Sequence, residues 1–136
     1  MRVIDGDTIE ATLYLTPKIT MRNQIQLANI DTPRINGAKC NTERKLGQAA
    51  KLFVEESFAM HDGRAVVSIS PKEDRFGRLV ASVTLGPAEI QYRPSPVSRG
   101  NELVLDLGDF LQENMVRAGL AVVWKEGDER TDWCSR

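Results

Sequence analysis

Apolar and polar side chains alternate along residues 9–27, and this alternation is the feature that most limits the folds open to the chain. The apolar positions of the first stretch are Ile9, Ala11, Leu13 and Leu15, and those of the second are Ile19, Met21, Ile25 and Leu27. A period of two residues is typical of a half-buried strand. Thr16-Pro17-Lys18 separates the stretches as a turn, so the sequence predicts an antiparallel hairpin whose second strand continues to about Ile30.

The remaining segments follow different patterns. Residues 41–60 have apolar residues at helical spacing, with Asn41 or Thr42 as the N-cap, and the helix is predicted to end at residues 61–63. Residues 66–70 and 79–85 predict a second hairpin. Residues 86–101 contain three prolines and two glycines, which predicts a long surface loop inserted into the domain. A helix is expected over residues 110–118, followed by a short strand that ends near Trp124.

This order of elements favours one mainly β (α+β) domain over residues 1–136: a five-stranded Greek-key barrel with two to three packed helices. The 136 residues, 41% of them hydrophobic, suffice for one core. A run of about 18 apolar residues, as a membrane span requires, is absent from the sequence, so we expect no membrane partner. We also expect no export signal within this chain.

The charge balance sets limits on the partners. Eighteen lysines and arginines face 19 acidic residues, which gives a net charge of −1. Extended electrostatic wrapping of DNA is therefore not expected. A focused site that grips one or two phosphates needs only local positive charge, so a nuclease is less affected by this limit than an architectural DNA-binding protein.

Three short segments carry the chemical signal: Val3-Ile4-Asp5-Gly6-Asp7-Thr8, Ile30-Asp31-Thr32-Pro33-Arg34 and Asp74-Arg75-Phe76-Gly77-Arg78. In this order they resemble the active-site segments of the staphylococcal nuclease (thermonuclease) family, whose members cut phosphodiesters with calcium. The resemblance extends from Val3 to about Trp124. It implies a barrel of the oligonucleotide/oligosaccharide-binding (OB) type and a focused site for single-stranded DNA, RNA or nucleotide phosphates.

The resemblance also implies a set of metal ligands. Asp7, Asp31 and the carbonyl of Thr32 match the calcium ligands of the family, and Asp5 matches an acid that holds a metal-bound water. Several oxygen donors suit a hard cation such as Ca²⁺. The alternative is that these residues are only turn-formers, since Asp and Pro favour turns for local reasons.

The catalytic positions match only in part. Arg78 matches one of the two family arginines, and its fork geometry suits a phosphate. Gln26 stands where the family has the second arginine, and it brings no charge. Arg34 stands where the family has a glutamate; because a guanidinium does not lose its proton in proteins, Arg34 cannot be a general base. We expect it to bind phosphate, to point into solvent or to pair with Glu43.

Substitutes for the missing groups are limited. Arg22 shares the strand face of Gln26 but lies about 13 Å away along an extended strand. Glu43 or Glu10 could be recruited as a base, although no pattern places either one at the site. Trp124 falls near a family position whose aromatic ring stacks on a base, while a tryptophan that ends an apolar strand is more often part of a core.

The two cysteines leave the compartment open. Gly37-Ala38-Lys39-Cys40 and Trp133-Cys134 resemble segments of exported-looking family members, which implies a disulfide and a periplasmic or secreted protein. The alternative is two free thiols in the cytoplasm.

Three functions are consistent with these residues. The first is a calcium-dependent nuclease that Gln26 and Arg34 weaken. The second is a catalytically silent OB module that binds nucleotide, nucleic acid or a protein partner. The third is a structural barrel in which even the aspartates are idle.

Overall fold

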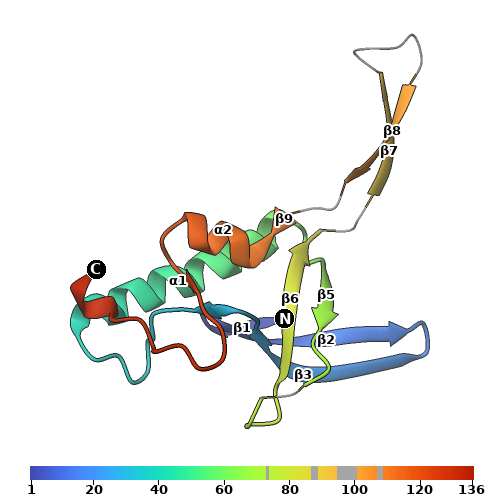
Figure 1. Cartoon of the computed structure of the whole chain (residues 1–136). Coiled ribbons are helices and arrows are strands. Elements are labelled where there is room, and N and C mark those ends of the chain that lie inside the picture. The colour runs from blue at the N-terminus through green and yellow to red at the C-terminus, as the bar shows by residue number, and fades with distance from the viewer. Residues whose placement is uncertain (73, 87–88, 95–100, 107–108) are drawn as a thin grey trace.

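The computed structural model describes residues 1–72, 74–86, 89–94, 101–106 and 109–136, and of residues 89–94 and 101–106 it describes the backbone alone. A curved mixed sheet carries helix α1 (Asn41–Met60) across one side (Figure 1). Buried residues of the sheet and both helices form one hydrophobic core, which includes Ile9, Ile25, Val54, Leu85 and Met115.

The sheet follows the predicted hairpins. Strands β1 (Arg2–Asp5), β2 (Thr8–Thr16) and β3 (Ile19–Leu27) pair antiparallel in sequence. After α1, strands β5 (Ala65–Ile69) and β6 (Leu79–Leu85) form the second hairpin, and β6 lies parallel to β3. The second predicted strand is interrupted at Asn29, where φ is 61°. Its continuation to Ile30 is the separate strand β4 (Ile30–Asp31).

The predicted fold class is confirmed, but the ring of strands is not closed. The order of the main sheet path is β1-β2-β3-β6-β5. In the part of the chain that the structure describes, β1 and β5 do not pair. An open groove of about 540 Å³ lies between β2 and β5. Apolar side chains line it, including those of Leu13, Leu15, Phe58, Val66 and Ile69.

Helix α1 has the predicted bounds, although its N-cap differs. Cys40 caps the helix, because its Sγ accepts a hydrogen bond from the backbone N–H of Glu43 at 3.3 Å. Asn41 and Thr42 are the first two helical residues instead. His61 is the C-cap, as predicted. The buried face of the helix includes Ala50, Val54 and Phe58, which pack on the sheet.

The predicted surface loop over residues 86–101 is wrong in part. Strand β7 (Glu89–Pro94) pairs antiparallel with β8 (Asn101–Asp106) to form a hairpin that projects beyond the end of β6 (Figure 1). The density of prolines and glycines predicted a loop. Residues 89–93 contain no proline, however, so each of their backbone N–H groups can take part in strand pairing. Residues 87–88 and 95–100 of the predicted loop lie outside the described residues.

The C-terminal part returns to the start of α1. Strand β9 (Asp109–Phe110) pairs with β6 and leads into α2 (Leu111–Arg117), close to the predicted helix, and β10 (Val122–Val123) pairs with β4. The 3-10 helix η1 (Trp133–Ser135) then carries Cys134, which forms a disulfide with Cys40. The disulfide alternative is therefore confirmed. Among the described helices, none is long and apolar enough to cross a membrane.

Candidate functional site

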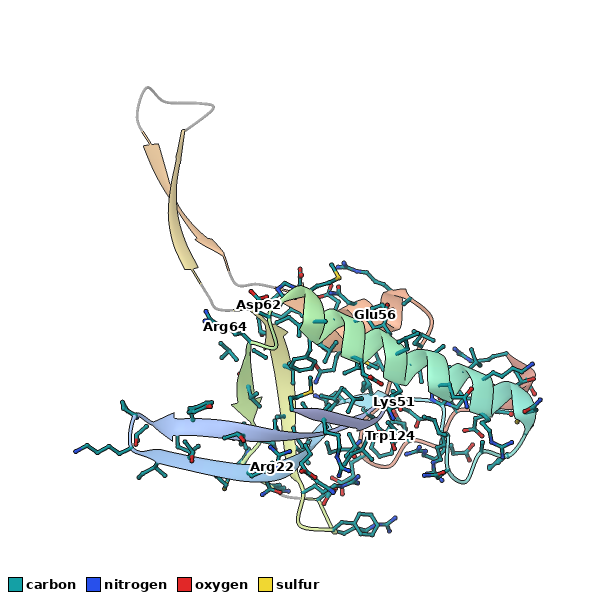
Figure 2. The ribbon with its side chains drawn as sticks, turned by 180° about the vertical axis from the view of Figure 1, so that it is seen from behind. Arg22, Lys51, Glu56, Asp62, Arg64 and Trp124 are labelled. Carbon is teal, nitrogen blue, oxygen red and sulfur yellow. A yellow bond between two sulfur atoms is a disulfide. The ribbon has the colours of Figure 1, made fainter. Side chains whose placement is uncertain are left out.

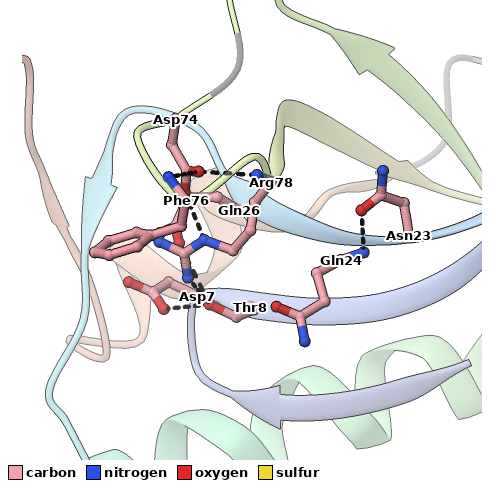
Figure 3. A network of polar contacts seen from close by, with 8 residues as sticks. All are labelled: Asp7, Thr8, Asn23, Gln24, Gln26, Asp74, Phe76 and Arg78. Atoms are coloured by element: carbon pink, nitrogen blue, oxygen red, sulfur yellow. Dashed lines mark hydrogen bonds and ion pairs between the residues drawn. The ribbon is translucent and has the colours of Figure 1, made fainter.

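The hydroxyl of Thr8 joins residues of the first segment, of β3 and of the third segment (Figure 3). Its Oγ1 lies 3.1 Å from Asp7 Oδ1 and 3.3 Å from Gln26 Oε1, and it accepts a hydrogen bond from Arg78 Nη1 at 3.3 Å. Because a hydroxyl has one proton, it can donate to either acceptor in turn. Thr8 is 3% exposed, so these contacts belong to the packed interior of the site. The sequence did not single out Thr8, although it lies within the first segment.

Arg78 is held in place by the turn that precedes it. The carboxylate of Asp74 accepts hydrogen bonds from the backbone N–H of Phe76 and Arg78, both at 2.9 Å, and from Nε of Arg78. Gly77 allows the turn because its φ is 74°. The Arg78 guanidinium carbon lies 5.3 Å from the centre of the Phe76 ring. Nη2 of Arg78 donates to none of the residues that the structure describes.

The electrostatics of this turn follow from the same contacts. Burial, the largest single influence, would raise the pKa of Asp74, but the hydrogen bonds from Arg78 and Phe76 outweigh it and hold that pKa below its ordinary value. Asp74 is therefore a carboxylate at neutral pH and fixes the orientation of Arg78.

Asp5 and Asp7 lie in the tight turn between β1 and β2. The backbone N–H of Asp7 donates to Asp5 Oδ1 at 3.1 Å, which is the local turn contact expected of Asp. Burial, together with the neighbouring Asp7 side chain, raises the pKa of Asp5 to about 7. Two carboxylates share a partly buried turn, and their mutual repulsion favours a cation or a proton between them.

Helix α1 brings the first two segments together. An added Cβ on Gly6 would lie 2.8 Å from Ala50 Cβ and 3.4 Å from Thr32 Cβ, so the first segment touches both the helix and the second segment. An added Cβ on Gly47 would lie 2.7 Å from the carbonyl carbon and oxygen of Arg34. Two glycines therefore let the two segments approach the helix closely.

Asp31 is buried, with 1% exposure, and the C-terminal segment covers its carboxylate. The backbone N–H of Thr131 donates to Oδ2 at 2.8 Å, and Nη2 of Arg130 forms an ion pair with Oδ1 at 2.9 Å. The angle of the Arg130 contact is not that of a hydrogen bond, and Oδ1 has no hydrogen-bond donor among the described residues. The sequence held no signal for Arg130, since 99 positions separate it from Asp31 and it lies outside every motif.

Arg34 does not pair with Glu43 through its guanidinium. The Glu43 carboxylate instead accepts the backbone N–H groups of Arg34 at 3.2 Å and of Lys39 at 2.9 Å. Glu43 is buried and ties the loop to α1, whereas Arg34 is exposed. The alternative that Arg34 pairs with the Glu43 side chain is therefore wrong, and Glu43 holds the loop to α1 instead.

Arg22 and Glu10 are engaged with each other on the outer face of β2 and β3. Nη2 of Arg22 lies 2.9 Å from Glu10 Oε1, and Arg2 lies 3.0 Å from Glu10 Oε2. Figure 2 shows Arg22 on this face, away from α1. Gln26 lies four residues further along β3, so neither Arg22 nor Glu10 supplies the groups that are absent at positions 26 and 34.

Trp124 is half-buried and follows β10. Its backbone N–H donates to the carbonyl of Asn29 at 2.9 Å, and its indole Nε1 donates to the carbonyl of Asp128 at 3.1 Å. Trp124 is thus not part of the closed core, and its indole N–H closes the loop that leads to Arg130. Its predicted role in base stacking stays a prediction.

The residue chemistry at the first two segments suits a hard cation. Asp5 and Asp7 give adjacent carboxylates, Asp31 Oδ1 is a buried oxygen that lacks a donor, and Thr32 adds a backbone carbonyl. Within the described ranges, no three His, Cys, Asp or Glu side chains group around one point. A bound ion would therefore need the carbonyl and waters as further ligands.

The fold and the site define an OB-type α+β domain whose polar site joins the β1–β2 turn, the end of β3 and the turn that precedes β6. The chain belongs to the family described as "Staphylococcal nuclease homologue", which matches residues 24–133. The chain is therefore related to nucleases. The second and third segments lie inside the matched range, and the first precedes it. No curated protein matches the chain.

Proposed function

We propose that this protein binds phosphodiesters of single-stranded DNA or RNA in the manner of a thermonuclease, with Ca²⁺ at Asp7, Asp31 and Thr32, and cleaves them weakly. The observation that carries this proposal is the position of Arg78: Asp74 orients it, and Thr8 connects it to Asp7. A guanidinium fixed in this way binds a phosphate oxygen through its remaining N–H groups.

Hydrolysis needs an attacking water, neutralised phosphate charge and help for the leaving oxygen. When bound, calcium supplies positive charge to the phosphate oxygens. Arg78 binds and orients the phosphate, and Asp5 holds a water near the ion. Gln26 contributes no charge, because its side-chain amide is neutral, and its Oε1 accepts from the Thr8 hydroxyl. Arg34 cannot remove a proton from water. The proposed activity is therefore low.

The experiment compares the native chain with Gln26→Arg/Arg34→Glu on single-stranded DNA, with calcium and with chelator. Loss of one charged transition-state contact costs on the order of a hundred- to a thousand-fold. Loss of a general base costs about a hundred- to ten-thousand-fold. We therefore expect the double variant to be faster by at least about a hundred-fold and to release 3′-phosphates, as the family resemblance implies. Adding Arg78→Lys to the double variant should remove most of the gain.

Two results would contradict the proposal. A folded double variant that stays as weakly active as the native chain would mean that positions 26 and 34 do not face the substrate. A native chain that is already fast, and matches an equally fast double variant, would mean that another residue serves as the base.

A catalytically silent binding module is the second candidate function. The observation that favours it is that Glu10 and Glu43 are both engaged elsewhere, so neither is free to act as a base. Calorimetry with a short single-stranded oligonucleotide would then show calcium-assisted binding, while the native chain shows no turnover. The Cys40–Cys134 disulfide supports an oxidising compartment, periplasmic or extracellular, for either function.

A further inference from the structure

The C-terminal segment places a positive charge on a predicted cation ligand. Arg130 Nη2 lies 2.9 Å from Asp31 Oδ1, and the Thr131 amide donates to Oδ2, so both oxygens of the carboxylate are contacted. Asp31 is almost fully buried, whereas the Arg130 side chain is 46% exposed. The arginine therefore covers the carboxylate from the solvent side.

Two anchors hold this segment in place. Trp133, three residues beyond Arg130, is 3% exposed. Cys134 is bonded to Cys40 at the N-terminus of α1. A tethered group has a high effective concentration at its contact, because its binding is intramolecular. The anchors therefore favour the Arg130–Asp31 pair over binding of a free cation.

Arg130 and a divalent cation cannot both bind the Asp31 carboxylate at full strength. One carboxylate carries one negative charge, and two positive groups at its two oxygens repel each other in a buried setting. The Arg130 contact also lacks hydrogen-bond geometry, so Oδ1 gains charge compensation without a directed donor. Such an ion pair can be exchanged for a metal–oxygen bond.

We propose that the segment Arg130–Thr131 is an autoinhibitory latch that competes with a divalent cation for Asp31. This inference rests on the proposed function, because it assigns regulation to the same site. A cation binds when the latch leaves the carboxylate, and the Cys40–Cys134 disulfide makes that departure harder. By linkage, closure of the latch lowers cation affinity by the same factor by which a bound cation lowers closure of the latch.

The test measures Ca²⁺ affinity by calorimetry on the full oxidised chain, on Arg130→Gln and on the control Arg117→Gln. Arg117 pairs with Glu113 on the exposed side of α2 at 2.7 Å, so its variant loses the same charge away from the site. We expect Arg130→Gln to bind Ca²⁺ about 5- to 150-fold more tightly, the usual range of coupling. Arg117→Gln should match the native chain.

A second readout follows the latch itself. Amide hydrogen exchange at Thr131 should be slow in the calcium-free native chain, because this N–H donates to Asp31. It should become fast when Ca²⁺ is added. The variant Cys40→Ser/Cys134→Ser should also gain calcium affinity, and it keeps a side chain at position 40 that can cap α1, because serine is a favoured N-cap residue. This variant carries the test if Arg130→Gln does not fold.

The outcomes separate the latch from the proposed function. Equal calcium affinity in the native chain and Arg130→Gln would overturn the latch and leave the calcium site intact. Calcium binding while the Thr131 amide still exchanges slowly would also overturn the latch and leave the calcium site intact. No calcium binding by any of the chains would overturn the latch and also the calcium dependence of the proposed function.

Discussion

Arg78 Nη1 donates to Thr8 Oγ1 at 3.3 Å and so joins two residues that lie 70 positions apart in the chain. The contact is made possible because β3 pairs with β2 on one side and with β6 on the other. Gln26 stands opposite Thr8 in that register. One buried hydroxyl therefore sets the relative positions of an acid, an amide and an arginine.

Replacing Thr8 by valine should destabilise the protein by about 1–2 kcal/mol, because the amide of Gln26 and the guanidinium of Arg78 each lose a partner in a partly buried place. Denaturant unfolding would measure the change. Thr12→Val is the matched control, since Thr12 lies on the same strand and accepts from the exposed Arg22. It should cost no more than about 0.5 kcal/mol. Equal losses of stability in the two variants would show that the contacts of the buried Thr8 hydroxyl contribute no more than those of the exposed Thr12 hydroxyl.

Gly47→Ala should destabilise the protein, although helix propensity alone would make alanine better by about 1 kcal/mol in a helix interior. The new Cβ would lie 2.7 Å from the backbone carbonyl of Arg34, and overpacking against backbone typically costs about 1–3 kcal/mol. Thermal unfolding would give the sign. Gln48→Ala, at the neighbouring exposed position, is the control and should be close to neutral. A more stable Gly47→Ala chain would mean that the loop and α1 are not in close contact.

The contribution of Asp74 to stability should depend on pH. Its pKa in the folded protein lies below the ordinary value of 3.8, so its stabilisation is complete above that value and is lost as the pH falls through the folded pKa. Asp74→Asn should therefore be less stable than the native chain by about 1 kcal/mol at pH 7, and the difference should shrink in acid below pH 3.8.

Unfolding curves of both chains between neutral and strongly acid pH would measure this difference. The exposed Glu113→Gln serves as a control and should change stability by only a few tenths of a kcal/mol at neutral pH. A difference for Asp74→Asn that stays constant into strong acid would contradict the ion pair with Arg78.

Removing residues 87–108 should leave the domain folded. Leu85 and Asp109, which flank this segment closely, are already paired across β6 and β9. Replacing the segment by Asn-Gly after Gly86 gives a three-residue connection between the paired Leu85 and Asp109, a length that is common in hairpins. The shortened chain should keep the Cys40–Cys134 disulfide, and its thermal midpoint should stay within a few degrees of the native value. Loss of the cooperative transition would mean that the segment belongs to the core rather than being an insertion.

Much of the fold follows from local patterns. Alternation over residues 9–27 predicted β2 and β3, and helical spacing predicted the bounds of α1, because both patterns record which side of a local element faces a core. The region 86–101 was predicted less well. Prolines and glycines mark turns, but they do not reveal that β7 finds a partner in β8 beyond the predicted loop.

The site divides in the same way. The sequence by itself determined which residue types stand at each position: the acids Asp5, Asp7 and Asp31, the arginine Arg78, and the substitutions Gln26 and Arg34. Side-chain chemistry follows from identity alone, so the absence of charge at position 26 and of a base at position 34 needed no structure.

Only the tertiary structure decided which of these groups are free. Glu43 is engaged with backbone amides, and Arg130 covers Asp31. These partners lie outside the three motif segments, and the order of residues along the chain does not link them to the motifs. Chain folding and the disulfide from Cys134 to Cys40 bring the C-terminal segment onto the second motif. Long-range contacts of this kind depend on packing in three dimensions, which residue spacing along the chain does not encode.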